Sequence, residues 1–312
     1  MVHVPEGPSN GHAAAEAPFD RIVLVFNPDP AKKPVHTAHA LRAELAERLP
    51  DVPVQMLPTA FAGHAREVAR AAAAHGRPLL VSVSGDGGYN EVVNGVMDSG
   101  GRAPCAVVAA GNANDHRRST STQPLVEAIV GGRTWRMDLL RLSLDFPEGE
   151  APGGRRTQYA HSYIGFGVTP AMAIGIEEVG KGRLRELIAV ARTIPRLRPV
   201  ELVRADGARA EFDSLILANI TGMAKYGTVS ESGQPMDGRF EVIAMQHASR
   251  WRLALMTLRA VTVGLGPQAS VKSYAFTVVD PVPFQIDGEI LQIPAGTSVL
   301  VESVPGALAI PG

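Results

Sequence analysis

The first half of the chain alternates short apolar runs with amphipathic segments, and this alternation restricts the fold more than any other feature. The segments, strand-like first, are 21–26, 37–49, 52–57, 63–75, 79–84, 89–97, 106–109 and 124–130. Runs that are apolar at nearly every position are typical of strands buried on both faces. Such strands in alternation with helices predict an open parallel sheet covered by helices. We therefore expect an α/β domain over residues 20–133.

The pattern changes after residue 133, because strand-like runs then follow one another with turn residues between them. These runs are 136–144, 158–164, 199–203, 215–220, 240–245, 274–279 and 298–304. Consecutive strands of this kind predict a mainly antiparallel, β-rich second domain over 134–312, interrupted by helices at 184–194 and 250–263. Residues 1–19 are rich in Ala, Gly, Pro and Ser, and we expect them to form a disordered tail.

Composition limits the classes of function. At 312 residues the chain has the length of about two domains. The charges nearly cancel, with 30 Lys and Arg against 31 Asp and Glu, so no overall field favours nucleic acid. Cys105 is the single cysteine, which excludes an intrachain disulfide and fits a reducing cytoplasm. We expect a cytoplasmic protein with no nucleic-acid partner and no membrane span; a homodimer is left open.

A strand leads into a glycine-rich turn and then a helix at residues 81–95. Gly85, Gly87 and Gly88 would let a ligand approach the backbone, and the N-terminus of a helix offers unpaired N–H groups to an anion. This pattern indicates a phosphate site. Asp86 would repel phosphate unless Mg²⁺ or a reacting hydroxyl stands between them. The alternative is a plain strand-to-helix turn in which Asp86 is a cap.

A second turn, residues 109–118, follows the next strand. It places Asn114 and Asp115 at the carboxyl end of that strand, where open parallel sheets bind their ligands. The alternative is ordinary turn chemistry. Asp-Gly pairs elsewhere, at 206–207, 237–238 and 287–288, predict hairpin turns.

Several motifs, in one order along residues 21–302, resemble the diacylglycerol kinase catalytic-domain family. This family includes sphingosine kinases and bacterial lipid kinases and is distantly related to NAD kinases. Gly85 to Gly95 is similar to its Gly-Asp-Gly-Thr-x-Asn-Glu-Val-x-Asn-Gly signature, with Gly88 in place of threonine. Residues 111–115 resemble its Gly-Thr-x-Asn-Asp signature. The remaining matches are Asn27-Pro28, Thr59 with Gly63-His64-Ala65, Met236 to Val242, and Asp287-Gly288-Glu289.

The resemblance implies a site between the two domains that binds ATP and Mg²⁺. The residues it assigns to the nucleotide are Asn27, Pro28, Thr59, Ser84, Gly85, Asp86, Gly87, Gly88, Asn90, Glu91, Asn112, Asn114 and Asp115. By similarity, Glu289 is the general base with Asp287 beside it, and Asp86 organises Mg²⁺ and the phosphates or is itself the base. A further Mg²⁺ would be held by Asp237 with backbone oxygens of Gln234 and Arg239.

The function that the resemblance implies is transfer of the ATP γ-phosphate to the hydroxyl of a diacylglycerol-like lipid. A NAD kinase-like nucleotide kinase is one alternative. A catalytically impaired nucleotide- or lipid-binding regulator is another, since Gly88, Asn112 and Pro30 depart from the family pattern. Residues 181–198 are basic and amphipathic, which fits transient contact with a membrane surface or a helix with a solvated basic face.

Overall fold

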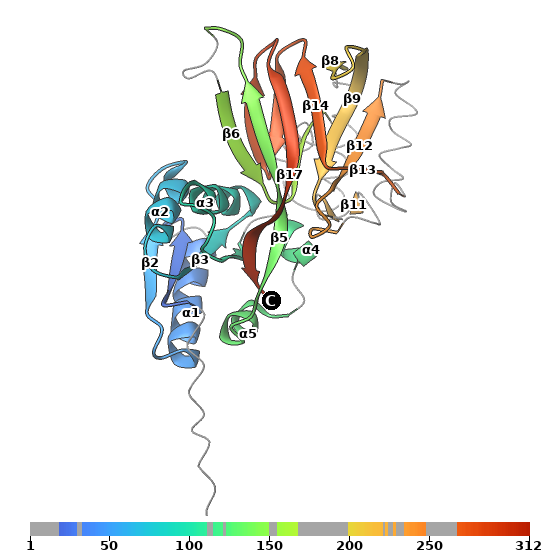
Figure 1. Cartoon of the computed structure of the whole chain (residues 1–312). Coiled ribbons are helices and arrows are strands. Elements are labelled where there is room, and N and C mark those ends of the chain that lie inside the picture. The colour runs from blue at the N-terminus through green and yellow to red at the C-terminus, as the bar shows by residue number, and fades with distance from the viewer. Residues whose placement is uncertain are drawn as a thin grey trace, which may run out of the picture.

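The computed structural model describes residues 19–29, 33–110, 115–120, 123–149, 155–167, 199–220, 222–223, 227–228, 234–247 and 267–312. Over these residues the chain forms two lobes that are joined by two long strands (Figure 1). The helices predicted at 184–194 and 250–263, the basic segment 181–198 and nearly all of the predicted tail lie outside the described residues.

The first lobe contains a four-stranded parallel sheet in the order β2-β1-β3-β4. Its strands are β1 (Arg21–Phe26), β2 (Val54–Pro58), β3 (Pro78–Ser84) and β4 (Cys105–Ala109). The helices are α1 (Lys33–Arg48), α2 (His64–Ala73), α3 (Asp86–Asp98), α4 (Asp115–Thr120) and α5 (Leu125–Val130). The predicted open parallel sheet with helices is confirmed.

The strand β1 shows why the apolar runs are continuous. Ile22 and Leu24 pack in a cluster with α1 and α5, whereas Val23 and Val25 pack in another with α2 and α3. Successive side chains of a strand point to opposite faces, so a sheet covered on both faces needs apolar residues at every position.

The second lobe is an antiparallel sheet, as predicted, in the order β16-β15-β7-β9-β8-β14-β17-β5-β6, with β12 paired to β9 and β13. Its strands are β5 (Thr134–Asp145), β6 (Arg155–Ala160), β7 (Tyr163–Phe166), β8 (Val200–Arg204), β9 (Arg209–Ala218), β12 (Phe240–Gln246), β13 (Ala269–Val271), β14 (Ser273–Val278), β15 (Val282–Ile286), β16 (Glu289–Ile293) and β17 (Ser298–Pro311). The short strands β10 (Gly222–Met223) and β11 (Gly227–Thr228) pair with each other.

The strands β5 and β17 contribute to the cores of both lobes, and Figure 1 shows them running from one lobe into the other. Leu142 and Val301 pack in the core of the second lobe, whereas Met137 and Leu308 pack with α2 and α3 in the first. The register of the ladder shifts between Val304 and Leu308. Such a bulge turns a strand and redirects its side chains, which suits a pair of strands that changes cores. The domain boundary at residue 133 stays a prediction.

Two element predictions were wrong in detail. The strand predicted at 158–164 is two strands, β6 and β7, because His161 and Ser162 form a turn whose N–H groups donate to the carboxylate of Asp287. The helix predicted from residue 89 begins at Asp86, so two of the glycines lie in its first turn rather than before it.

Candidate active site

The glycine-rich segment places the N-terminus of α3 at the carboxyl end of β3. Gly85 is the N-cap of this helix and, as a glycine, has no side chain that could accept a hydrogen bond from the first N–H groups. The first N–H groups of a helix have no partner within it and carry the positive end of the helix dipole. The location is also the edge at which open parallel sheets bind ligands. An anionic group is therefore favoured here.

A pocket of about 600 Å³ lies beside this helix, between the loops after β1 and β2. Pockets for small molecules usually measure about 300 to 1,000 Å³, so a nucleotide fits. The lining residues are Val25, Phe26, Asn27, Pro28, Asp29, Thr59, Ala60, Phe61, Ala62, Ala65, Ser82, Ser84, Gly88 and Glu91. Six of them were predicted from the sequence to contact the nucleotide: Asn27, Pro28, Thr59, Ser84, Gly88 and Glu91.

Asp86 connects the two glycine-rich turns. Its Oδ2 accepts a hydrogen bond from the N–H of Asp115 at 3.1 Å, and its Oδ1 accepts one from the N–H of His116 at 3.3 Å. Asp115 and His116 are the first two residues of α4, so the carboxylate of Asp86 caps that helix. A carboxylate with both oxygens engaged is better suited to holding the loop than to taking a proton from a substrate.

Asp287 is fully buried and accepts four N–H groups. Its Oδ1 accepts from the backbone of Ser162 and Tyr163, both at 2.9 Å, and its Oδ2 accepts from the backbone of His161 at 2.6 Å. The fourth donor is Nδ2 of Asn90 on α3, at 2.8 Å. Asp287 therefore fixes the β15–β16 turn against the β6–β7 turn and against the first lobe.

Glu289 follows this turn and lies over the first turn of α3. A Cβ atom added at Gly87 would be 3.2 Å from Cγ of Glu289, so a larger residue at this position would displace the Glu289 side chain. Burial raises the pKa of Glu289 to about 7, and the negative charges of Glu91 and Asp287 add to the rise. Arg156 and Arg66 oppose it. A carboxyl group with a pKa near neutrality is suited to general acid–base work.

The other polar residues of the glycine-rich motif hold the surrounding elements. Glu91 accepts hydrogen bonds from the N–H groups of Gly63 and Ala65 at 3.0 and 3.1 Å, and so caps α2. Nδ2 of Asn94 donates to the carbonyl of Tyr159 at 2.9 Å, and Oδ1 accepts the N–H of the same residue at 2.8 Å. The motif therefore joins α3 to α2 and β6 as well as facing the pocket.

Three aromatic side chains form a buried cluster behind Asp86 and Asp287. The ring of Tyr89 lies 4.8 Å from the rings of both His116 and His161, and the two histidine rings are 4.6 Å apart. The sequence analysis did not identify His161 or Tyr89, because neither has a partner at a recognisable spacing. Only the turn at 161–162 brings His161 to Asp287.

The remaining predicted site residues are Asn112, Asn114, Asp115 and those of the predicted magnesium turn at Asp237. Asn112 and Asn114 lie outside the described residues, as does the turn between them. Asp115 is buried and forms an ion pair with Arg118. Asp237 is exposed; its Oδ1 accepts the N–H of Arg239 at 2.9 Å and its own N–H donates to the carbonyl of Gln234 at 3.4 Å. A magnesium ion at this turn stays a prediction.

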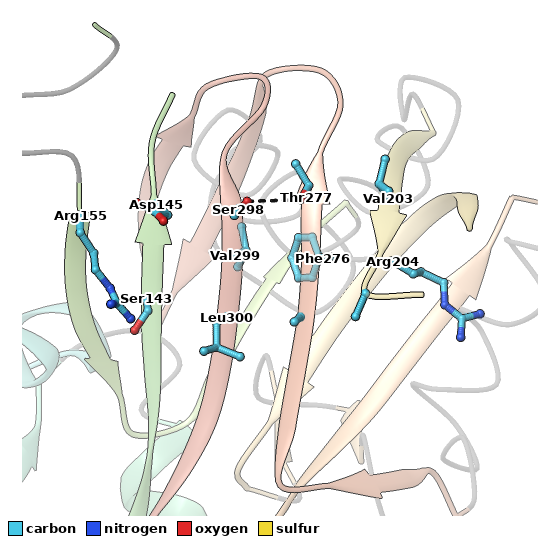
Figure 2. A pocket seen from close by; sticks show the side chains of 12 residues that line it. Ser143, Asp145, Arg155, Val203, Arg204, Phe276, Thr277, Ser298, Val299 and Leu300 are labelled. Carbon is cyan, nitrogen blue, oxygen red and sulfur yellow. Dashed lines mark hydrogen bonds between the residues drawn. The ribbon is translucent and has the colours of Figure 1, made fainter. Parts of the chain in front are cut away.

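A second pocket, of about 330 Å³, lies on the outer face of the second lobe (Figure 2). It crosses β6, β5, β17, β14 and β8, and Oγ1 of Thr277 and Oγ of Ser298 lie 3.4 Å apart within it. None of the predicted site residues lines it, so it is not part of the candidate active site.

Residues 21–142 match the family model described as the diacylglycerol kinase catalytic domain. The matched residues comprise all four strands of the parallel sheet, the glycine-rich turn and the first part of β5.

Curated proteins similar to this chain include diacylglycerol kinases of Staphylococcus species. The enzyme of Staphylococcus epidermidis is 26% identical over 194 residues, which are 58% of this chain and 56% of the relative, little more than half its length. The enzyme of Staphylococcus carnosus is 24% identical over 291 residues, which are 86% of this chain and 88% of the relative.

Solved structures share the fold of both lobes. A protein from Bacillus anthracis described as a diacylglycerol kinase has a TM-score of 0.68 and 18% identity, with 94% of this chain and 97% of that chain covered. Yeast NADH kinase has a TM-score of 0.51 and 14% identity, with 92% and 79% covered. Among the described residues no helix is long and apolar enough to cross a membrane.

Proposed function

We propose that this protein is an ATP- and Mg²⁺-dependent lipid kinase that transfers the γ-phosphate of ATP to the hydroxyl of a diacylglycerol-like lipid. The observation that carries the proposal is the position of Glu289. This carboxylate from the second lobe lies over Gly87, at the end of α3 that borders the pocket, and burial raises its pKa to about 7. The names of the curated relatives support diacylglycerol as the class of acceptor.

Phosphoryl transfer requires mainly alignment of donor and acceptor and neutralisation of developing negative charge. In the proposed complex the nucleotide occupies the 600 Å³ pocket, and its phosphates extend to the first turn of α3. The free N–H groups and the dipole of that turn stabilise negative charge. Glu289 then accepts the proton of the lipid hydroxyl as the hydroxyl oxygen attacks the γ-phosphorus. The bond from the γ-phosphorus to the β–γ bridging oxygen breaks in the same step, and ADP leaves with the electron pair of that bond.

The described residues fit a magnesium ion that arrives with the nucleotide. Mg²⁺ usually keeps several waters and binds one or two carboxylates together with substrate phosphates. Asp86 retains lone pairs beyond its two hydrogen bonds and is the first residue of α3. Among the described residues no three His, Cys, Asp or Glu side chains are grouped so that they could hold a metal ion. Mg²⁺ neutralises charge on the transferring phosphoryl group when it is bound.

The lipid acceptor places the proposed reaction at a membrane surface, with the protein itself in the cytoplasm. An acceptor with two acyl chains stays in the bilayer, so the side of the molecule that carries Glu289 would have to face that surface. Vesicle co-sedimentation in the presence and absence of diacylglycerol measures this contact directly.

The test of the function is a transfer assay with labelled ATP and Mg²⁺, in which diacylglycerol vesicles and NAD are offered separately. Label in an organic-soluble product supports the proposal, and label in NADP overturns it in favour of a nucleotide kinase. ATP binding without transfer to any acceptor overturns it in favour of a regulator. Glu289→Gln is expected to slow transfer by about 100- to 10,000-fold. Glu148→Gln, an exposed carboxylate outside the site, is the matched control and should transfer at the wild-type rate.

A further inference from the structure

Phe61, in the loop between β2 and α2, is an apolar side chain left largely exposed. Its exposed fraction is 59%, and among the described residues only Met236 and Ile290 are other large apolar side chains classed as exposed. A single exposed apolar side chain is common on protein surfaces and does not by itself mark a site. Phe61, however, also lines the 600 Å³ pocket beside α3. A ligand in this pocket would therefore contact the ring.

The orientation of the Phe61 ring is fixed before any ligand binds. The ring of His64 stacks on it, with ring centroids 4.7 Å apart and an angle of 29° between the planes. His64 is held in turn, because its Nδ1 accepts the N–H of Ala60 at 3.0 Å. One face of the phenyl ring is thus covered by imidazole. A ring held in place loses little conformational entropy when a planar group stacks on its other face.

The two sides of the pocket differ in polarity. Its α3 side presents small and polar residues, Ser84 and Gly88, next to a helix N-terminus that favours phosphate. Its wall at the β2–α2 loop presents Phe61 and Ala62. A nucleotide has the same division, because its phosphates are anionic and its base is planar and weakly polar.

We propose that Phe61 is the stacking platform for the nucleobase of the bound nucleotide and so contributes to its selection. This inference rests on the proposed function and assigns a residue that has no counterpart among the motif positions of the family. Stacking of a base on an aromatic side chain is sequence-tolerant but stronger for larger ring systems. The platform therefore favours purine over pyrimidine nucleotides.

The test compares a probe that carries a base with one that does not. Calorimetric titrations with Mg-ATP and with Mg-tripolyphosphate are made on the wild-type chain, Phe61→Leu, Phe61→Trp and Arg70→Ala, an exposed residue of α2 that serves as control. Phe61→Leu is expected to weaken ATP binding by about 5- to 100-fold and to leave tripolyphosphate binding unchanged. Phe61→Trp and Arg70→Ala should bind ATP at least as tightly as the wild type. In turnover, Phe61→Leu should raise KM for ATP without lowering kcat.

Two results would overturn the inference. One is equal ATP affinity of Phe61→Leu and the wild type. The other is an equal loss for both probes, which would make Phe61 a support for the loop alone. Failure of the proposed function would give a different result. A wild-type chain that binds ATP but phosphorylates no lipid would refute the proposed lipid-kinase activity. The comparison of the two probes would then still decide the role of Phe61. A wild-type chain that binds no ATP overturns both.

Discussion

The side-chain amide of Asn90 donates a hydrogen bond to the buried carboxylate of Asp287 at 2.8 Å, and this contact fastens the second lobe to α3. The same carboxylate orders the turn that precedes Glu289. The general base of the proposed reaction therefore depends on a contact between a residue early in the chain and one near its end. The residues around this contact lead to four predictions.

Asp287→Asn should destabilise the protein without disturbing the turn locally. Asp287 has a φ of 47°, in the left-handed region that asparagine tolerates well, so the backbone can stay as it is. An amide cannot accept all four N–H groups, and we expect the free energy of unfolding to fall by about 2 to 4 kcal/mol. Denaturant unfolding measures this. Asp206→Asn, in an exposed Asp-Gly turn, should change it by less than about 0.5 kcal/mol.

The proposed activity should depend on pH through Glu289. Its pKa is raised to about 7, so the carboxyl group holds its proton below that pH and cannot accept one from a hydroxyl. We expect kcat/KM to fall about tenfold for each pH unit below 7 and to level off above it. Arg156→Gln removes a positive charge that lowers this pKa and should move the midpoint upward. A profile that stays flat from pH 5 to 8 would exclude Glu289 as the base.

Two glycines of the same helix should respond differently to alanine. At Gly87 the added methyl group would meet the flexible side chain of Glu289, so Gly87→Ala should keep its melting temperature and lose lipid-kinase activity. At Gly95 the methyl group would lie 2.3 Å from the backbone oxygen of Arg66, and Gly95→Ala should lose about 1 to 3 kcal/mol of stability. Thermal unfolding and transfer rate, measured on both variants, separate the two effects. Equal unfolding temperatures for the two variants would contradict this assignment.

Acid should destabilise the protein through His116. Burial lowers the pKa of His116 well below its usual value, and the neighbouring His161 adds to the effect. Below about pH 6.5 the unfolded chain takes up a proton that the folded chain refuses, so the free energy of unfolding falls as pH falls. His116→Gln should reduce this slope by up to about 1.4 kcal/mol per pH unit. The exposed His75→Gln is the control and should leave the slope unchanged.

The local sequence pattern was sufficient to predict the parallel sheet. Strands such as Arg21–Phe26 are buried on both faces, and their sequences are therefore apolar at nearly every position. It was insufficient at 158–164, where the break between two strands depends on Asp287 from the far end of the chain. A contact between distant segments leaves no periodicity in either of them. The pattern therefore predicted a single strand.

Local sequence pattern likewise predicted only part of the candidate site. Gly88 of the glycine-rich turn and the loop residues Asn27 and Thr59 line one pocket, and their contact with a nucleotide stays a prediction. The predicted roles of the acidic residues stay predictions, although the structure shows Asp86 capping α4 and Asp287 saturated by N–H groups. Phe61 was not identified, because an isolated aromatic residue in a loop has no spacing that indicates a function.

The arrangement of β17 has a consequence for how the chain is assembled. Leu308 and Ile310 complete the core that α2 and α3 begin, yet the ribosome produces them only after every strand of the second lobe. The core of the first lobe is therefore complete only after the second lobe has been synthesised. Until those residues emerge, the nascent first lobe exposes apolar surface, and chaperones that recognise such surface have the whole length of the second lobe in which to act.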